Sequence, residues 1–175
     1  MTSDGPLGNG LYRFSIAASL TDSVGNPLDG NADGTGGDSF VRIFRVELPA
    51  GVVFEGRSND EFASATPLPL AENPAGSGHF LAHGIGSIDP NDGSTWWERD
   101  VWTFSVLAGD QVAVYMDTPN SPIDARIYLY TIDPAGLTET LIAEDYYRGP
   151  DDDAFISRWI APADALCGLY AVHQG

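Results

Sequence analysis

Oxygen-bearing side chains recur at alternate positions in the segment 29–38, which reads Asp-Gly-Asn-Ala-Asp-Gly-Thr-Gly-Gly-Asp. The spacing matches the first half of an EF-hand-type loop, in which residues 1, 3 and 5 supply side-chain oxygens and residue 7 supplies a carbonyl. Ca²⁺ prefers six to eight oxygen ligands, and alternate side chains around a tight turn can converge on one ion. The pattern therefore predicts a Ca²⁺ site with the ligands Asp29, Asn31, Asp33, Thr35 and Asp38.

This loop lacks the bidentate glutamate that closes an EF-hand, because position 12 is Phe40. Asp38 or Asp22 would have to complete the coordination sphere. The loop also joins two predicted strands instead of two helices, so we expect a structural site and no calcium switch. The alternative is a connection rich in Asn, Asp and Gly that Asx turns stabilise without a metal.

Other catalytic and metal-binding patterns fail on spacing. His79 and His83 lie in a predicted strand, where four residues span roughly 13 Å, too far for one zinc ion. Cys167 and His173 are separated by about six strand residues, roughly 20 Å, too far for a thiolate pair. Gly84-Ile-Gly86 lacks the third glycine of a dinucleotide loop, and no Gly-x-Ser-x-Gly elbow is present. We therefore expect no enzyme.

The charge balance limits the partners. The chain carries 25 acidic and 8 basic residues, a formal net charge of -17, which repels nucleic acid and anionic lipid and attracts cations. A single cysteine rules out an internal disulfide framework. No apolar run approaches the ~20 residues that span a bilayer. The first ten residues lack the basic and apolar regions of a signal peptide, so we expect any export signal to lie outside this chain.

Short runs of alternating apolar and polar residues, separated by 20 Gly and 12 Pro, predict strands and no helix. Leu107–Asp110 is expected to join two of them as a tight hairpin. Many short strands with turns between them predict an all-β fold, an antiparallel and jelly-roll-like β-sandwich. The clearest runs are 11–17, 40–47, 101–106, 111–115 and 126–130, and weaker ones are 79–83, 140–143, 155–160 and 169–173.

The chain divides near residues 49–60. Only two strands are predicted before that point, and two strands do not make a self-sufficient domain. At least six strands are predicted after it, enough for a sandwich. Two explanations remain open for residues 1–48: they are the end of a domain whose earlier strands are missing, or their hairpin packs onto the sheet of the second domain.

Three N-terminal segments carry a family resemblance. They are Asn-Gly-Leu-Tyr-Arg-Phe-Ser-Ile from residue 9, Asp-Ser-Val-Gly-Asn-Pro-Leu-Asp-Gly from residue 22 and Phe-Val-Arg-Ile-Phe-Arg-Val from residue 40. Together they resemble the closing part of the bacterial Ig-like domains that repeat in large surface and secreted proteins. The resemblance implies that residues 1–48 are the C-terminal part of such a domain, followed by a linker over 49–58.

The rest of the chain carries a second resemblance, on Asn59-Asp60, Ala65-Thr-Pro-Leu68, Asp100-Val-Trp-Thr-Phe-Ser-Val-Leu-Ala-Gly109, Ala125-Arg-Ile-Tyr-Leu-Tyr130, Ala161-Pro-Ala-Asp164 and Gly168-Leu-Tyr-Ala-Val172. In this order they resemble the bacterial pre-peptidase C-terminal domain, a β-sandwich appended to secreted peptidases and other exported proteins. Ala165-Leu-Cys167 is an insertion relative to that family's last strand. The resemblance implies a sandwich over 59–175, truncated at its C-terminus, with an auxiliary role.

A second Ca²⁺ site follows from this resemblance alone. Related collagen-binding modules of some bacterial collagenases hold Ca²⁺ with an acidic linker and carboxylates near the start of a core strand. The positions that correspond here are Glu55, Asn59, Asp60 and Asp100. Arg57 stands where those modules have another acid, and its charge opposes a cation.

Exposed aromatic residues offer a different role. Trp96 and Trp97 are adjacent in sequence, so in a strand they point to opposite faces and one of them can be exposed. Trp97, with Tyr146 and Tyr147, could stack on sugar rings or anchor a protein partner. The alternative is that the tryptophan side chain only covers the hydrophobic core and binds no partner. Four further aromatic residues are assigned to packing: Trp102, Phe104, Phe155 and Trp159.

These observations lead us to expect a non-catalytic accessory or spacer module of a larger secreted or surface bacterial protein, stabilised by Ca²⁺. Its expected location is extracellular or on the cell surface, and its expected partners are neighbouring domains of the same polypeptide. Two alternatives remain: an adhesive module that binds extracellular protein or polysaccharide, and an appendage of a secreted peptidase whose catalytic domain lies outside this chain.

Overall fold

The computed structural model describes residues 7–56, 58–88, 99–118, 123–133, 135, 138–146 and 153–173. Over these residues the chain forms strands and one 3-10 turn, η1 (Phe62–Ser64), which confirms the predicted all-β class. The chain divides into two compact units, Pro6–Pro49 and Ala50–Gly175, called here the N-terminal and C-terminal units.

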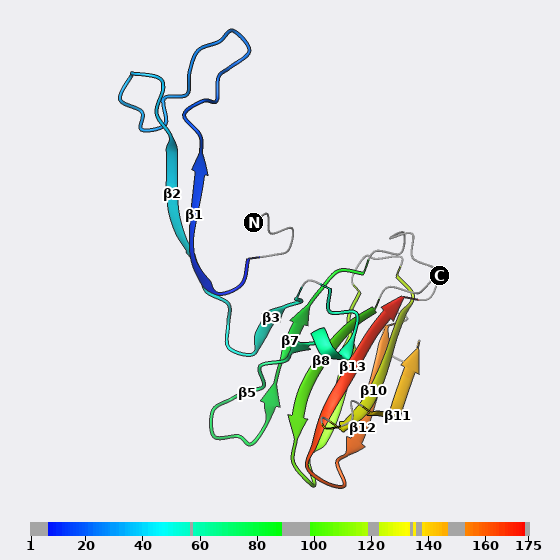
Figure 1. The fold of residues 1–175 in the computed structure, drawn as a ribbon. Coiled ribbons are helices and arrows are strands. Elements are labelled where there is room, and N and C mark those ends of the chain that lie inside the picture. Colours follow the sequence, from blue (N-terminus) through cyan, green and yellow to red (C-terminus); the bar gives the residue numbers. More distant parts are fainter. Residues whose placement is uncertain are drawn as a thin grey trace. The chain divides into compact units, whose positions relative to one another are not determined.

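The N-terminal unit is built on one hairpin. β1 (Gly10–Ile16) pairs with β2 (Phe40–Val46) in an antiparallel register that runs from Gly10 opposite Val46 to Ile16 opposite Phe40 (Figure 1). The Asn9 side-chain oxygen accepts a hydrogen bond from the Leu48 N–H and closes the base. Residues 17–39 form the long connection at the other end.

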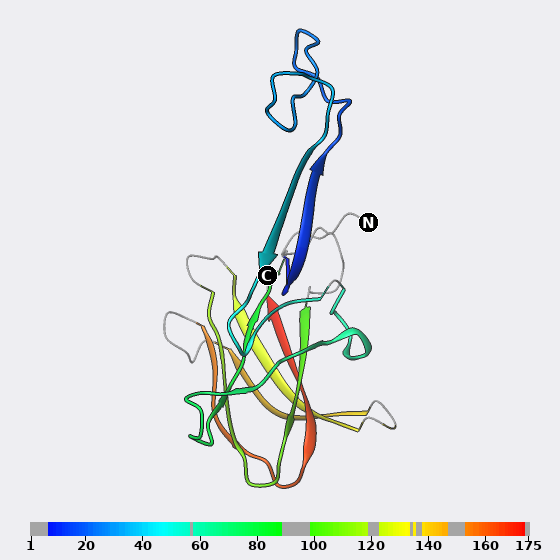
Figure 2. The ribbon, with the colours of Figure 1, turned by 90° about the vertical axis from the view of Figure 1, so that its left-hand side faces the viewer.

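The C-terminal unit contains the remaining strands: β3 (Val52–Phe54), β4 (Thr66–Pro67), β5 (Ala71–Glu72), β6 (Phe80–Leu81), β7 (His83–Ile85), β8 (Arg99–Val106), β9 (Gln111–Met116), β10 (Ala125–Asp133), β11 (Thr138–Tyr146), β12 (Ala154–Ile160) and β13 (Ala165–His173). The main sheet has the order β11-β10-β13-β8-β4, and Figures 1 and 2 show β10 and β13 side by side. Three two-stranded sheets accompany it: β12-β9, β3-β7 and β5-β6. The β3–β7 and β4–β8 pairs are parallel, so the strand pairing is mixed. The sequence predicted purely antiparallel pairing.

The core lies between the main sheet and the β9–β12 pair. Alternate residues of β8 and β10 point inward, and Phe104, Ile127 and Leu129 are buried among them. Ile156 of β12 and Cys167 of β13 belong to the same cluster. Because one strand face from each layer contributes, this unit buries a continuous apolar interior without any disulfide.

The turn at Leu107–Asp110 does not close a hairpin, contrary to the sequence prediction. β8 pairs with β13 and β4, whereas β9 pairs with β12, so the turn carries the chain from one sheet to the other. The turn chemistry itself is as expected, since Gly109 has φ +92° and the Asp110 N–H donates to the Leu107 carbonyl at 3.0 Å. Turn residues specify a reversal of direction, and the burial of the strand faces decides which strands pair.

Two other segments differ from the prediction. Residues 52–54, assigned to the linker 49–58, form β3 and pair with β7. The single strand predicted over 79–83 is two short strands, β6 and β7, with a break at Ala82. Both segments are too short for alternation to be read reliably from sequence.

The outer face of the main sheet is covered by η1. An added Cβ on Gly168 of β13 would lie 2.7 Å from the Ile132 Cδ1 and 3.9 Å from the Phe62 Cδ2. The Phe62 ring of η1 therefore approaches the sheet at Gly168, the position that has no side chain. Val101 and Tyr170, on the same outer face, are 0% and 5% exposed. The main sheet is therefore buried on both faces at this point.

Candidate functional site

The predicted loop 29–38 gathers its carboxylates. Asp29, Asp33 and Asp38 each offer an oxygen that lies within 4.8 Å of the others. Asp29 and Asp33 are exposed and Asp38 is half-buried. The loop thus places three negative charges around one point, which is the arrangement that the spacing predicted.

Backbone hydrogen bonds to two of the carboxylates shape the loop. Asp29 accepts from the Asp33 N–H at 3.1 Å through Oδ1 and from the Gly34 N–H at 2.8 Å through Oδ2. Asp38 Oδ1 accepts from the N–H groups of Gly30 and Asn31 across the loop. These Asx-type bonds are also those expected of a metal-free turn, so the backbone path is compatible with both interpretations.

Asn31 and Thr35 orient the third carboxylate. The Asn31 amide donates to Asp33 Oδ2 at 3.0 Å and the Thr35 N–H donates to Asp33 Oδ1 at 2.8 Å. The hydrogen bond from Thr35, followed by that from Asn31, lowers the pKa of Asp33 because both stabilise the charged form. Asp22 accepts from Val24 and Asn26 in its own turn, so Asp38, and not Asp22, is the acid that joins Asp29 and Asp33 in the loop.

The donor set fits a hard cation. Three carboxylates, the Asn31 amide oxygen and the Thr35 carbonyl are oxygen ligands of the type that Ca²⁺ takes, and a carboxylate that accepts one or two N–H bonds keeps further lone pairs. Without a cation the three charges repel one another within 4.8 Å. The N–H donors offset part of that repulsion, and a divalent ion would offset the rest.

Three of the four residues of the second predicted site also come together, beside Gly86. An added Cβ on Gly86 would lie 2.5 Å from Glu55 Oε2 and 2.9 Å from Asp100 Oδ2. Glu55 is held there by the Ser87 N–H and hydroxyl, each at 3.1 Å. Asp100 is 5% exposed. Two carboxylates from distant segments thus share the space that a side chain at Gly86 would fill.

Asn59, 3% exposed, completes this cluster. With its amide nitrogen turned inward, Asn59 donates to the Gly56 carbonyl at 2.9 Å and to Asp100 Oδ1 at 3.1 Å. The opposite amide orientation would bring three oxygens together, and only a cation between them would make that favourable. The site therefore has a residue that can serve either the metal-free or the metal-bound arrangement.

Asp60, the fourth predicted ligand, is exposed. Its backbone carbonyl accepts a hydrogen bond from Arg99 Nε at 2.7 Å. The same guanidinium pairs with Glu61 Oε1 at 2.7 Å. Arg57 lies outside the described residues. Sequence reasoning missed the part played by Gly86, because it considered this glycine only as a fragment of a nucleotide-binding loop.

The predicted aromatic site is described only in part, because Trp97 and Tyr147 lie outside the described residues. Tyr146 is 40% exposed, and the Arg126 guanidinium carbon lies 4.6 Å from its ring centroid. The two residues are direct neighbours on β10 and β11. The structure therefore places Tyr146 against Arg126 with part of its side chain exposed.

The assignments to packing are confirmed. Trp102 and Phe104 are 5% and 9% exposed in the core. Trp159 is partly buried against the same cluster. The Phe155 ring packs edge-on against Tyr115 with centroids 6.2 Å apart.

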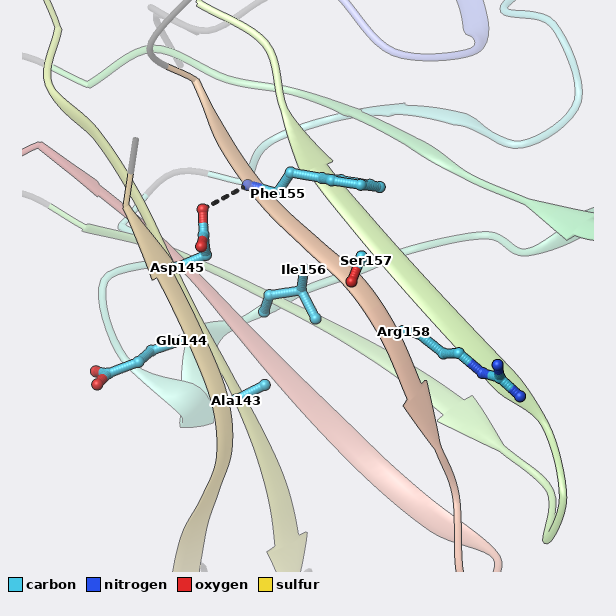
Figure 3. Close-up of a pocket in the computed structure, with 7 residues that line it drawn as sticks. All are labelled: Ala143, Glu144, Asp145, Phe155, Ile156, Ser157 and Arg158. Carbon is cyan, nitrogen blue, oxygen red and sulfur yellow. Dashed lines mark hydrogen bonds between the residues drawn. The ribbon is translucent and has the colours of Figure 1, made fainter. Parts of the chain in front are cut away.

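A groove of ≈ 300 Å³ runs between the edge strands β11 and β12 (Figure 3). Asp145 Oδ2 accepts from the Phe155 N–H at 2.9 Å and joins the two strands there. The polar side chains that line the groove are those of Glu144, Asp145, Ser157 and Arg158. Among the described residues that line the groove there is no histidine or cysteine, so none of them offers Ser157 an imidazole base.

The lone cysteine is a core residue. Cys167 is 0% exposed, and burial raises the pKa of its thiol to about 11, so the thiol stays protonated at neutral pH. His173 Nδ1 accepts from the Asp124 N–H at 2.9 Å. Each group therefore has a structural role, and the thiol is unsuited to nucleophilic attack.

Among the described residues, no helix has the length and apolar character needed to cross a membrane. Comparisons with family models, with curated proteins and with solved structures return no match for this chain.

Proposed function

We propose that this chain is a non-catalytic accessory or spacer module of a larger secreted or surface bacterial protein, and that Ca²⁺ stabilises it. The observation that carries the proposal is the loop 29–38, in which oxygens of Asp29, Asp33 and Asp38 lie within 4.8 Å of one another. A cluster of this kind gains stability from a divalent cation, because the ion offsets the repulsion among the carboxylates.

The expected affinity matches an extracellular setting. Ca²⁺ modules outside the cell bind with a Kd on the order of 10⁻⁴–10⁻³ M, weaker than cytosolic sensors. The loop lacks the bidentate glutamate at position 12, which favours this weak class. A cation that binds only the folded loop stabilises it by about 2.7 kcal/mol when its concentration is 100 times the Kd.

Titration of Ca²⁺ into the full chain after treatment with a chelator tests the first site. We expect slower hydrogen exchange of the amides in 29–38 and a higher Tm, because the ion removes the repulsion among the carboxylates. Asp33→Ala should abolish the slowing, whereas Asp117→Ala, which changes an exposed acid outside the cluster, should leave it intact. If Ca²⁺ slows exchange in neither the unaltered chain nor the control, the loop is a metal-free Asx connection.

The same titration on Gly86→Ala tests the second site separately. The added methyl would lie within 3 Å of the Glu55 and Asp100 carboxylates, so it should displace them and prevent an ion from binding there. We expect Ca²⁺ to slow exchange around residues 55–59 in the unaltered chain and not in Gly86→Ala. The response of loop 29–38 should be the same in both. Equal protection of 55–59 in the two proteins would contradict a cation at Gly86.

A second candidate function, adhesion to an extracellular polymer, is favoured by Tyr146. Its side chain is 40% exposed and the Arg126 guanidinium carbon lies 4.6 Å from the ring centroid, and exposed aromatic surface of this kind stacks on sugars or apolar side chains. Retention of the chain on immobilised polysaccharide or structural protein, with loss in Tyr146→Ala, would favour adhesion over a spacer. Equal retention of both proteins would exclude Tyr146 as the anchor.

A further inference from the structure

The sequence contains a single Asn-Gly pair, Asn9-Gly10, and the structure places it at the base of the β1–β2 hairpin. Asn9 is exposed to solvent and lies at a bend directly before β1. Gly10, the first residue of β1, has no Cβ to keep its backbone nitrogen away from a neighbouring side chain. The pair therefore combines access to solvent with a backbone nitrogen that can approach the asparagine amide.

The two ends of the Asn9 amide are held differently. The side-chain oxygen Oδ1 accepts a hydrogen bond from the Leu48 N–H, which reaches it from the chain that leaves β2. The nitrogen Nδ2 makes no hydrogen bond to any of the described residues. The oxygen is thus fixed against a donor, whereas the nitrogen, which is the leaving group when such an amide is attacked, is not held by that part of the chain.

We propose that Asn9 is a deamidation site, at which the Gly10 backbone nitrogen attacks Asn9 Cγ with the help of the Leu48 N–H. Hydroxide takes the proton of the Gly10 amide, the nitrogen forms a bond to Cγ, and an electron pair of the C=O bond moves to Oδ1. When that carbonyl forms again, Nδ2 takes a proton from water and leaves as ammonia, and a cyclic imide remains. Water then opens the imide at Cγ to give aspartate, or at the main-chain carbonyl to give isoaspartate.

The Leu48 N–H lies where negative charge develops in this reaction. During the attack Oδ1 changes from an amide oxygen to an oxyanion, and a hydrogen bond to a charged acceptor is roughly twice as strong as one to a neutral acceptor. A donor that is already in place lowers the barrier by that difference without reorganisation. Because the site is exposed and water competes, the expected acceleration is roughly two- to tenfold, the size of one net hydrogen bond.

The other described asparagines lack this combination of features. Asn26 and Asn73 precede proline, whose nitrogen carries no proton and cannot form the imide. Asn31 precedes an alanine, and both ends of its amide are engaged: Oδ1 accepts from the Asp33 N–H at 2.9 Å, and Nδ2 donates to Asp33 Oδ2 at 3.0 Å. Asn59 is 3% exposed. Among the described residues the reaction should therefore be fastest at the Asn-Gly pair.

The isoaspartate product would change the base of the hairpin. Its main chain passes through the former side chain and is longer by a methylene group, so Oδ1 becomes part of the peptide link to Gly10. The hydrogen bond from Leu48 can then form only if the start of β1 moves. Because a two-stranded ribbon is marginal in water, the loss of this bond should fray the hairpin from its first pair, Gly10 and Val46.

Peptide mapping by mass spectrometry of the full chain, kept in mildly alkaline buffer, tests the proposal. We expect Asn9 to convert to aspartate and isoaspartate, with release of ammonia, before Asn31 converts. Leu48→Pro removes the N–H donor and should slow the conversion by roughly two- to tenfold. Leu48→Ala keeps the donor and is the matched control, so it should react as fast as the unaltered chain. In urea, where the hairpin is unfolded, the two variants should react at the same rate.

Hydrogen exchange of the β1 amides shows whether Leu48→Pro still forms the hairpin, and the order of conversion in the unaltered chain does not depend on either variant. Conversion of Asn31 before Asn9, or no conversion of Asn9 under conditions that convert an unstructured peptide of the same sequence, would overturn the site. A rate in Leu48→Pro equal to or above that in Leu48→Ala would show that the Leu48 N–H restrains the amide. A difference that persists in urea would show that proline acts on the unfolded chain, and either result would overturn the role of Leu48.

Discussion

Replacing Trp102 with alanine is expected to lower the free energy of unfolding of the C-terminal unit by about 3–5 kcal/mol. Trp102 is 5% exposed and lies between Leu169 of β13 and Thr66 of β4 in the main sheet. An added Cβ on Gly84 of β7 would lie 2.9 Å from the indole Cη2, so the ring reaches up to the backbone of a third strand. Its removal would leave a cavity that β-sheet backbones cannot close.

Urea denaturation followed by circular dichroism measures this loss without relying on the indole as a probe. Leu107→Ala is the control, because Leu107 is 65% exposed at a turn and its truncation should change stability little. Gly84→Ala tests the same contact from the other side and should cost about 1–3 kcal/mol by overpacking. A loss below about 1 kcal/mol for Trp102→Ala would show that the indole is not enclosed.

Asp153→Ala is expected to destabilise the same unit by about 2–3 kcal/mol at neutral pH. Asp153 is 5% exposed and accepts three hydrogen bonds: from the Tyr115 hydroxyl at 2.8 Å, from the Thr118 N–H at 3.0 Å and from the Thr118 hydroxyl at 2.7 Å. The carboxylate thus links the end of β9 to the start of β12. Alanine would leave these donors without their acceptor.

The loss at Asp153 should depend on pH. Burial alone would raise the pKa of this carboxyl, but the hydrogen bonds from Thr118 and Tyr115 together lower it. A folded pKa below the unfolded value of about 3.9 means that the stabilisation is complete above that value and is lost as the pH falls through the folded pKa. The difference in unfolding free energy between the unaltered chain and Asp153→Ala should therefore shrink between about pH 5 and pH 2.

Asp117→Ala serves as the control for Asp153, since it removes an exposed carboxylate from the same stretch of chain. Its effect on stability should be small, because its carboxylate is exposed. A penalty for Asp153→Ala that is as large at pH 2 as at pH 6 would contradict a role for the charged form. The residue would then act through contacts that the neutral carboxyl also makes.

Long strands with clear alternation were predictable. The runs that became β1, β8 and β10 have alternating side chains because one face of each is apolar, and the core residues Phe104 and Leu129 follow directly from that pattern. Pairing was harder to predict. The turn at Leu107–Asp110 has all the local signals of a hairpin, but its flanking strands belong to different sheets because they cover opposite sides of one core.

The two predicted metal sites differ in the same way, since one depends on local sequence and the other on contacts between distant segments. The loop 29–38 is local, so the spacing of its acids was enough to bring Asp29 and Asp33 together. The second cluster joins Glu55 and Asp100 through the space at Gly86, and these three residues come from three segments that spacing does not relate. Only a resemblance indicated Glu55 and Asp100, and nothing in the sequence marks Gly86 as the position that must lack a side chain.

The register of the N-terminal hairpin also determines how this unit would respond to mechanical tension. The chain enters the hairpin at Gly10 and leaves it at Val46, and these two residues face each other at one end of the ladder. A pulling force applied there would load the interstrand bonds one at a time, beginning beside the bond between Asn9 and Leu48. The hairpin would therefore open like a zipper, one interstrand bond after another, and would do so at low force.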